Sequence, residues 1–269
     1  MRLNIKFVLR GLLLALPVAA ITSVAFILVM FRAQLGRPPD PTPPPPTILA
    51  PRGELPAGPV GLQEWARYRG EVYSLVGSGF LIPLRDGKIV GVTTAHSVSL
   101  GNPDRPLEQI ALGVAGQTDF VAEFDTLWGQ PSQPRTGGDM TVDYVLLQTD
   151  QPIDSGFVLT PDPRGVPQPG ERVSLFSGLG DGHGGRRILA GTVQSVSDKA
   201  VWVLMDDLFN PGLMSGSPFV SQHTGQVVGM AIAVNLRGSR LLLGVHPIGS
   251  IVRLAESADE FPKIGEYRR

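Results

Sequence analysis

The chain has 269 residues, with 23 Lys and Arg against 24 Asp and Glu, and a formal net charge of -1 at pH 7. Nucleic-acid-binding domains usually show a strong basic excess, so we expect no nucleic acid partner. The sequence contains no cysteine and no group of His, Asp and Glu at metal-ligand spacing. It therefore predicts no disulfide framework, no metal site and no cofactor.

Residues 1–33 are predicted to form an N-terminal signal anchor. No residue between 11 and 31 is charged, and about 21 helical residues at about 1.5 Å each span the hydrocarbon core of a bilayer. The alternative is a cleaved signal peptide, because Val18-Ala19-Ala20 could supply the cleavage site. Cleavage there would leave the apolar segment 21–30 as a new terminus, so we favour an uncleaved transmembrane helix. More basic residues precede the span than follow it, which favours a cytoplasmic N-terminus and an external C-terminal domain.

Residues 34–57 are predicted to be a linker. Its central part, residues 38–46, contains seven prolines, which cannot form helix or sheet ladders and favour an extended polyproline II conformation. We expect the linker to act as a spacer between the bilayer and the following domain.

Residues 58–269 are predicted to form one all-β domain. Short apolar runs alternate with glycine and proline turns, which is typical of barrels and sandwiches. The predicted strands are residues 71–76, 79–83, 88–93, 109–114, 144–148, 172–177, 187–196, 200–205, 226–234 and 240–247. Residues 151–169 read as a connector between two halves. Residues 251–258 have the apolar spacing of a short terminal helix.

Three short segments of this domain carry residues suited to nucleophilic catalysis. Thr94-Ala95-His96-Ser97 supplies a histidine, Asp143-Tyr144-Val145 an aspartate, and Ser215-Gly216-Ser217-Pro218 a serine in a tight turn. A serine hydroxyl is a weak nucleophile that needs an imidazole to take its proton. The imidazole in turn needs a carboxylate that fixes its tautomer. Each residue alone is more often structural, but together they predict a triad of Ser215, His96 and Asp143.

Four motifs resemble the trypsin/chymotrypsin-like serine peptidases, particularly the bacterial branch of glutamyl endopeptidases and high-temperature-requirement proteases. They are Gly77-Ser78-Gly79-Phe80, Thr93-Thr94-Ala95-His96, Asp143-Tyr144-Val145-Leu146-Leu147 and Ser215-Gly216-Ser217-Pro218. The order His, Asp, Ser is that of this family. The resemblance implies two six-stranded antiparallel β-barrels with a short C-terminal helix, here preceded by the transmembrane helix. It also implies a serine endopeptidase, with Ser215 as nucleophile, His96 as general acid/base and Asp143 as its orienter.

One position departs from the family pattern. The family has glycine two residues before the nucleophile, because the backbone amides there and at the serine form the oxyanion hole. Here Leu213 occupies that position, so the implied hole is made by the amides of Leu213 and Ser215. A catalytically impaired scaffold that binds peptides or partner proteins is therefore the alternative function.

The resemblance also implies where substrate binds. The pocket is expected to be lined by Phe209, Asn210, Ile232, Ala233, Val234 and His246. No acidic residue is placed to receive a basic side chain, so we expect an apolar or small residue there. His246 leaves open a preference for glutamate. The expected partners are a protein or peptide substrate and the lipid bilayer. The expected location is a bacterial inner membrane, with the domain on the periplasmic side.

Overall fold

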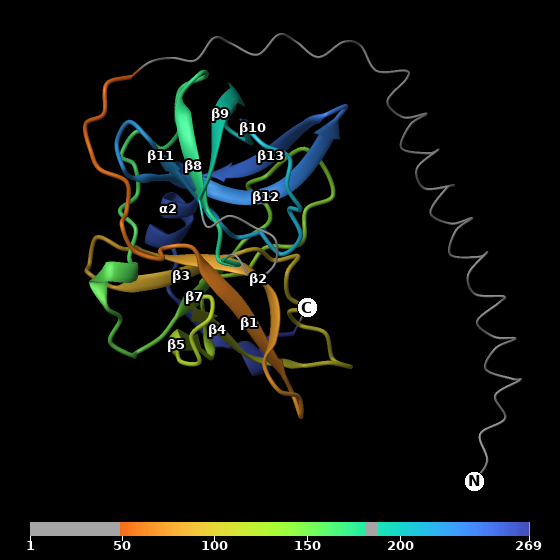
Figure 1. Cartoon of the computed structure of the whole chain (residues 1–269). Coiled ribbons are helices and arrows are strands. Elements are labelled where there is room, and N and C mark those ends of the chain that lie inside the picture. Colours follow the sequence, from red (N-terminus) through yellow and green to blue (C-terminus); the bar gives the residue numbers. More distant parts are fainter. Residues whose placement is uncertain (1–48, 181–187, 269) are drawn as a thin grey trace, which may run out of the picture. The chain divides into compact units, whose positions relative to one another are not determined.

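The computed structural model describes residues 49–180 and 188–268 (Figure 1). The predicted anchor, most of the predicted linker and the loop 181–187 lie outside the described residues. Within the described part, no helix is long and apolar enough to cross a membrane. All the strand ladders are antiparallel, and the chain forms one open sheet followed by one closed barrel.

The N-terminal half is an eight-stranded sheet in the order β14-β6-β7-β3-β2-β1-β4-β5. Its strands are β1 (Leu62–Tyr68), β2 (Ser74–Pro83), β3 (Ile89–Thr93), β4 (Leu107–Gly113), β5 (Phe120–Phe124), β6 (Thr126–Trp128), β7 (Val145–Gln148) and β14 (Glu260–Lys263). No ladder between described residues joins β5 to β14, so this sheet does not close.

Strand β2 connects the two parts of this sheet. Its first part, residues 74–79, pairs with β1, and its second part, Phe80 to Pro83, pairs with β3. The change of partner falls after Gly77-Ser78-Gly79. We predicted two separate strands here; the structure has one continuous strand that changes partner at the small residues.

The C-terminal half is a closed barrel in the order β10-β13-β12-β11-β8-β9. Its strands are β8 (Arg172–Phe176), β9 (Ile188–Val196), β10 (Val201–Met205), β11 (Pro218–Ser221), β12 (Val227–Arg237) and β13 (Arg240–Pro247). The connector between the halves contains the short 3-10 helix η1 (Ser155–Phe157). Helix α2 (Ile248–Glu256) and the 3-10 helix η3 (Ile264–Glu266) follow the barrel.

The all-β fold, the C-terminal barrel and the terminal helix were predicted correctly, whereas the prediction of two six-stranded barrels was wrong for the first half. There the C-terminal segment adds β14 to the edge of β6, and the ladder remains open. The sequence patterns also missed five strands, namely β1, β5, β6, β11 and β14. Most of these are only three to five residues long, too short for a periodic pattern.

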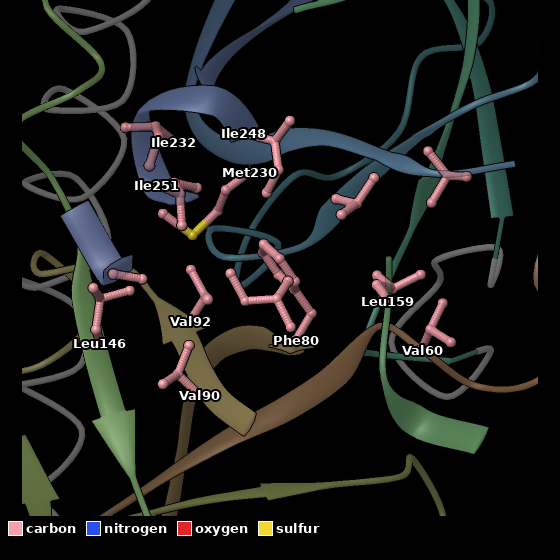
Figure 2. Close-up of a cluster of buried hydrophobic side chains, with 14 of the residues drawn as sticks. Val60, Phe80, Val90, Val92, Leu146, Leu159, Met230, Ile232, Ile248 and Ile251 are labelled. Atoms are coloured by element: carbon pink, nitrogen blue, oxygen red, sulfur yellow. The ribbon is translucent and has the colours of Figure 1, made fainter. Parts of the chain in front are cut away.

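A buried apolar cluster holds the two halves together (Figure 2). Phe80, Val92 and Leu146 come from the N-terminal sheet, and Met230 and Ile251 come from the barrel and helix α2. These side chains are at most 2 % exposed. Burial of apolar surface stabilises the folded state by about 25 cal/mol per Å². This cluster therefore fixes the relative position of the halves.

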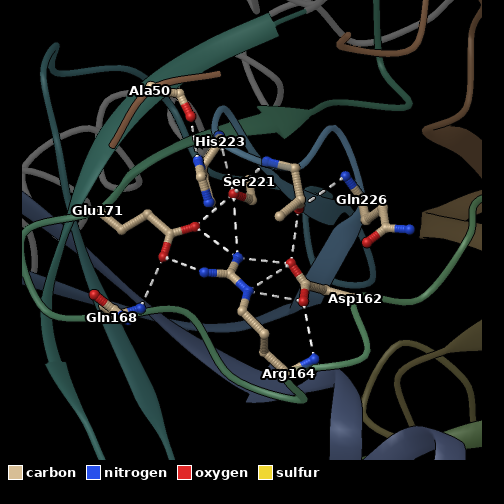
Figure 3. A network of polar contacts seen from close by, with 9 residues as sticks. Ala50, Asp162, Arg164, Gln168, Glu171, Ser221, His223 and Gln226 are labelled. Atoms are coloured by element: carbon tan, nitrogen blue, oxygen red, sulfur yellow. Dashed lines mark hydrogen bonds and ion pairs between the residues drawn. The ribbon is translucent and has the colours of Figure 1, made fainter. Parts of the chain in front are cut away.

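A polar network ties the connector to the barrel (Figure 3). The guanidinium of Arg164 pairs with Asp162 at 2.6 Å and with Glu171 at 2.9 Å, and both carboxylates are at most 1 % exposed. Ser221 donates a hydrogen bond to Glu171, and Thr224 donates one to Asp162. The network therefore joins the end of the connector to the turn between β11 and β12.

Candidate active site

Sheet topology brings His96 and Asp143 together. His96 follows the end of β3, and Asp143 precedes the start of β7. These strands are antiparallel neighbours, with Thr93 opposite Val145, so the end of one strand lies beside the start of the other. The histidine and the aspartate therefore lie side by side although 47 positions separate them.

Asp143 is fully buried and holds the histidine through two contacts. Its Oδ2 lies 2.8 Å from His96 Nδ1, and its Oδ1 accepts a hydrogen bond from the His96 amide at 3.1 Å. The Arg135 amide also donates to Oδ2, at 3.2 Å. Burial disfavours the charged carboxylate, but the hydrogen bond and charge of His96 and the two amides outweigh it and lower the pKa of Asp143. The carboxylate is therefore ionised at neutral pH.

Ser215 reaches this pair because its turn docks on β2. The Ser78 amide donates to the carbonyl of Ser215 at 2.9 Å, and the Ser78 hydroxyl donates to the carbonyl of Leu213 at 3.0 Å. On the barrel side, the Gly216 amide donates to Ala231 at 2.8 Å. As a result, Ser215 Oγ lies 2.8 Å from His96 Nε2. The three residues that the sequence singled out form one continuous chain of hydrogen bonds.

Leu213 has an unusual backbone conformation. Its φ is 63°, and among the described residues it is the one non-glycine residue with a positive φ. A side chain in this left-handed region costs roughly 1–2 kcal/mol. Neither its amide nor that of Ser215 donates to an acceptor within the described part of the chain. Both expected oxyanion-hole donors are thus free to bind a substrate oxygen.

A cleft of about 500 Å³ opens beside the triad. Of the predicted pocket residues, Ile232, Ala233 and Val234 line it. Phe209 and Asn210, also predicted for the pocket, are not among the residues that line this cleft: Phe209 packs against the barrel core, and Asn210 is exposed and accepts a hydrogen bond from the Gly212 amide. Residues that sequence reasoning missed also line the cleft: Arg135, Thr136, Pro211, Met214, Ala231 and Leu243. They come from segments without a motif, so no sequence signal singled them out.

His246, the last of the predicted pocket residues, is not among the residues that line the cleft. Its side chain is fully buried, and its ring lies 5.9 Å from that of Tyr144. His246 pairs with Met230 across β12 and β13, and Met230 belongs to the core between the halves. Burial lowers the pKa of His246 to about 4, so the ring is neutral at pH 7 and is not placed to receive a substrate carboxylate.

A second buried carboxyl, that of Glu64 on β1, lies beneath the histidine turn. A Cβ on Gly77 would lie 2.6 Å from Glu64 Oε2 and 2.8 Å from Ser97 Oγ, so both side chains approach Gly77 closely. No donor of the described chain makes a well-formed hydrogen bond to Glu64. Burial raises its pKa to about 8, although the nearby hydroxyls of Thr93 and Ser97 partly oppose this. The carboxyl is therefore protonated at neutral pH.

This proton makes stability depend on pH. The folded state keeps it up to about pH 8, whereas the unfolded chain releases it near 4.5, so the stability of the wild type falls as pH rises between these values. We expect Glu64→Gln to match the wild type at pH 4 and to be more stable at pH 9 by on the order of 5 kcal/mol. Urea unfolding at both pH values measures this. A surface change, Glu108→Gln, should show no such gain, and an equal gain for both variants would contradict the assignment.

This fold and this site define the class of protein: an open β-sheet and a β-barrel that share a Ser-His-Asp arrangement in the order His, Asp, Ser. The chain belongs to the family described as trypsin-like peptidase domain, whose model matches residues 77–230. The match includes His96, Asp143 and Ser215.

Solved structures with the same fold include product-bound tobacco etch virus protease. It is 16% identical, with a TM-score of 0.50, over 82% of this chain and 87% of the protease. Kallikrein-related peptidase 10 is 17% identical, with a TM-score of 0.50, over 73% of this chain and 93% of its own. A thermostable serine protease from an extremophilic microorganism is 11% identical, with a TM-score of 0.49, over 74% and 97%. The likeness to the first two structures supports the fold alone. No curated protein sequence matches the chain.

Proposed function

We propose that this protein is a membrane-anchored serine endopeptidase that cleaves extracytoplasmic proteins through an acyl-enzyme intermediate. The hydrogen-bond chain from Asp143 through His96 to Ser215 carries the proposal, because its two 2.8 Å contacts are those that activation of a serine requires. A free cleft beside Ser215 gives room for a peptide.

Each of these residues has a role in the proposed reaction. Ser215 Oγ bonds to the carbonyl carbon of the scissile peptide, and its proton passes to His96 Nε2. Asp143 holds the Nδ1–H of His96 and stabilises the imidazolium that forms. The oxyanion binds the free amides of Leu213 and Ser215. The C–N bond then breaks as His96 returns the proton to the leaving amine. Water next attacks the acyl-enzyme ester and gives a proton to His96, which passes it to Ser215 Oγ as the ester C–O bond breaks.

The cleft favours an apolar or small side chain next to the scissile bond. The lining of the cleft includes the apolar residues Met214, Ala231, Ile232, Ala233 and Leu243. The glutamate preference that a pocket histidine would confer has no support, since His246 is buried away from the cleft. Membership of the bacterial branch rests on the four motifs.

The membrane anchor and the external location rest on the amino-acid sequence. The uncharged segment 11–31 supports the anchor, and the basic residues before it support an external domain.

A serine-directed fluorophosphonate tests the reaction. We expect it to label the full-length protein at Ser215 and the label to vanish in His96→Ala, because only a deprotonated hydroxyl attacks phosphorus readily. Peptide mapping by mass spectrometry locates the label. Ser217→Ala is the matched control in the same turn and should still be labelled. Labelling that survives loss of His96 would contradict the triad.

A peptide-binding scaffold without catalysis is the second candidate, and Leu213 is the observation that favours it. Its strained backbone sits where the family has glycine, and loss of one oxyanion donor typically costs about 10²- to 10³-fold in rate. The same experiment separates the two functions. Absence of labelling at Ser215 in the folded wild type, together with measurable peptide binding, would favour the scaffold.

A further inference from the structure

The cleft beside the triad contains a cation without a counter-charge. Arg135 lines it together with His96, Asp143 and Ser215. Within the described part of the chain, no carboxylate lies within ion-pair distance of its guanidinium. The guanidinium carries five N–H donors, and the contact it makes is a hydrogen bond from Nη1 to the carbonyl of Gly137.

The carboxylates of the neighbouring residues Asp143 and Asp139 already bind other groups. The Asp143 carboxylate is held by His96 and by two backbone amides, one of them that of Arg135 itself. Asp139 accepts from Thr141 and lies 3.5 Å from Lys199. Neither carboxylate neutralises the guanidinium, so the side chain of Arg135 adds a full positive charge to the cleft.

The loop that carries Arg135, between β6 and β7, is fixed on both sides of it. On one side, Ser132 and Tyr144 exchange hydrogen bonds, with 2.6 Å from the Tyr144 amide to Ser132 Oγ. On the other side, Met140 is buried, and its amide donates to Lys199 at 2.8 Å. A loop whose backbone is held on both sides loses little conformational entropy when one of its side chains binds an anion.

We propose that Arg135 selects substrates that carry an acidic side chain close to the scissile bond. This inference rests on the proposed function and narrows its substrate class. The apolar wall at Met214 and Ile232 takes an apolar side chain, and the Arg135 guanidinium takes a carboxylate a short distance along the same peptide. An aspartate or glutamate can accept two parallel hydrogen bonds from the guanidinium, whereas an amide side chain cannot do so without losing the charge attraction.

The expected preference is about tenfold for an acidic over an isosteric neutral side chain, the size typical of one charge-assisted contact in a partly solvated site. It should shrink when salt is raised from about 50 to 500 mM, because the cleft is open to solvent.

Binding to the full-length Ser215→Ala protein in detergent tests this without turnover. The probes are tetramethylrhodamine-labelled peptides with a central leucine and alanine elsewhere, blocked at both ends, so that the glutamate is the one carboxylate of the peptide itself and the charge of the dye is the same in every probe. Each peptide carries a single glutamate, or a single glutamine at the same position. This residue occupies one of the three positions before the leucine or one of the three after it. Fluorescence anisotropy gives Kd for each pair. The same pairs without dye are then offered to the wild type and give kcat/KM.

We expect one position at which glutamate binds about tenfold more tightly than glutamine in the Ser215→Ala protein. The preference should disappear when Arg135→Gln is added and reverse, so that glutamine binds more tightly than glutamate, when Arg135→Glu is added. Arg69→Gln is the matched control, since it removes a surface arginine outside the cleft, and it should leave the ratio unchanged. Equal Kd values at all positions, a glutamate preference that survives Arg135→Gln, or no measurable binding would overturn the inference. Wild-type cleavage without a glutamate preference would overturn it while leaving the peptidase proposal intact. A glutamate preference in binding without any cleavage by the wild type would overturn the peptidase proposal and leave the role of Arg135 in peptide binding intact.

Discussion

Ser215→Ala in the full-length protein is expected to lower kcat/KM by about 10⁴-fold or more while leaving the fold intact. The reason is that Ser215 Oγ, 2.8 Å from His96 Nε2, is the atom that forms the covalent bond in the proposed reaction. The turn itself is held by backbone contacts to Ser78 and Ala231, which alanine keeps. Initial rates on a fluorogenic peptide with a central leucine, compared with circular dichroism spectra, measure both effects.

Ser217→Ala is the control for this change. Ser217 lies two residues further along the same turn, is fully buried, and its hydroxyl has no hydrogen-bond partner within the described chain. We therefore expect its kcat/KM to stay within a few-fold of the wild type. If Ser215→Ala retains more than about a hundredth of the activity, the nucleophile is another group.

Gly216→Ala is expected to destabilise the protein by more than about 4 kcal/mol and to abolish labelling of Ser215. Gly216 has φ +93°, and a Cβ there would lie 1.7 Å from the carbonyl oxygen of Ser78. Ser78 is also the residue that donates both hydrogen bonds to the serine turn. A methyl group cannot be placed without separating this turn from β2, and the separation takes Ser215 away from His96. Thermal and urea unfolding, with fluorophosphonate labelling, measure the loss.

Gly87→Ala separates the steric effect from the backbone effect. Gly87 has φ +85°, close to that of Gly216, but a Cβ there would meet nothing within 4 Å. We expect it to cost about 1–2 kcal/mol, the cost of the left-handed conformation alone, and to leave labelling unchanged. Similar losses for both variants would show that the contact with Ser78 is not what makes Gly216 necessary.

The amino-acid sequence was most informative where chemistry and local geometry coincide. A histidine after a β-strand, an aspartate before one and a serine in a glycine turn were recognised as a set, and the structure brings their side chains together at 2.8 Å. Long strands such as β12 and β13 were also predicted, because each contains a continuous apolar run that is bounded by turn residues.

Sequence reasoning was weakest for side chains whose direction depends on pairing. His246 was expected in the pocket, yet the register of β13 on β12 places it opposite Met230 and inside the core. Arg135 and Glu64 carry no motif. Their chemistry arises from burial and from missing counter-charges, which are properties of the surroundings and not of the neighbouring sequence.

The sequence by itself determined the kinds of group available, their order along the chain and the β character of the domain, because these depend on residue type and short-range periodicity. Only the tertiary structure decided that the first sheet stays open, that His246 is excluded from the cleft and that Arg135 faces it. The physical reason is that a one-residue shift in strand register moves a side chain from one face to the other. Register is set by contacts between residues far apart along the chain, such as the pairing of Thr93 with Val145.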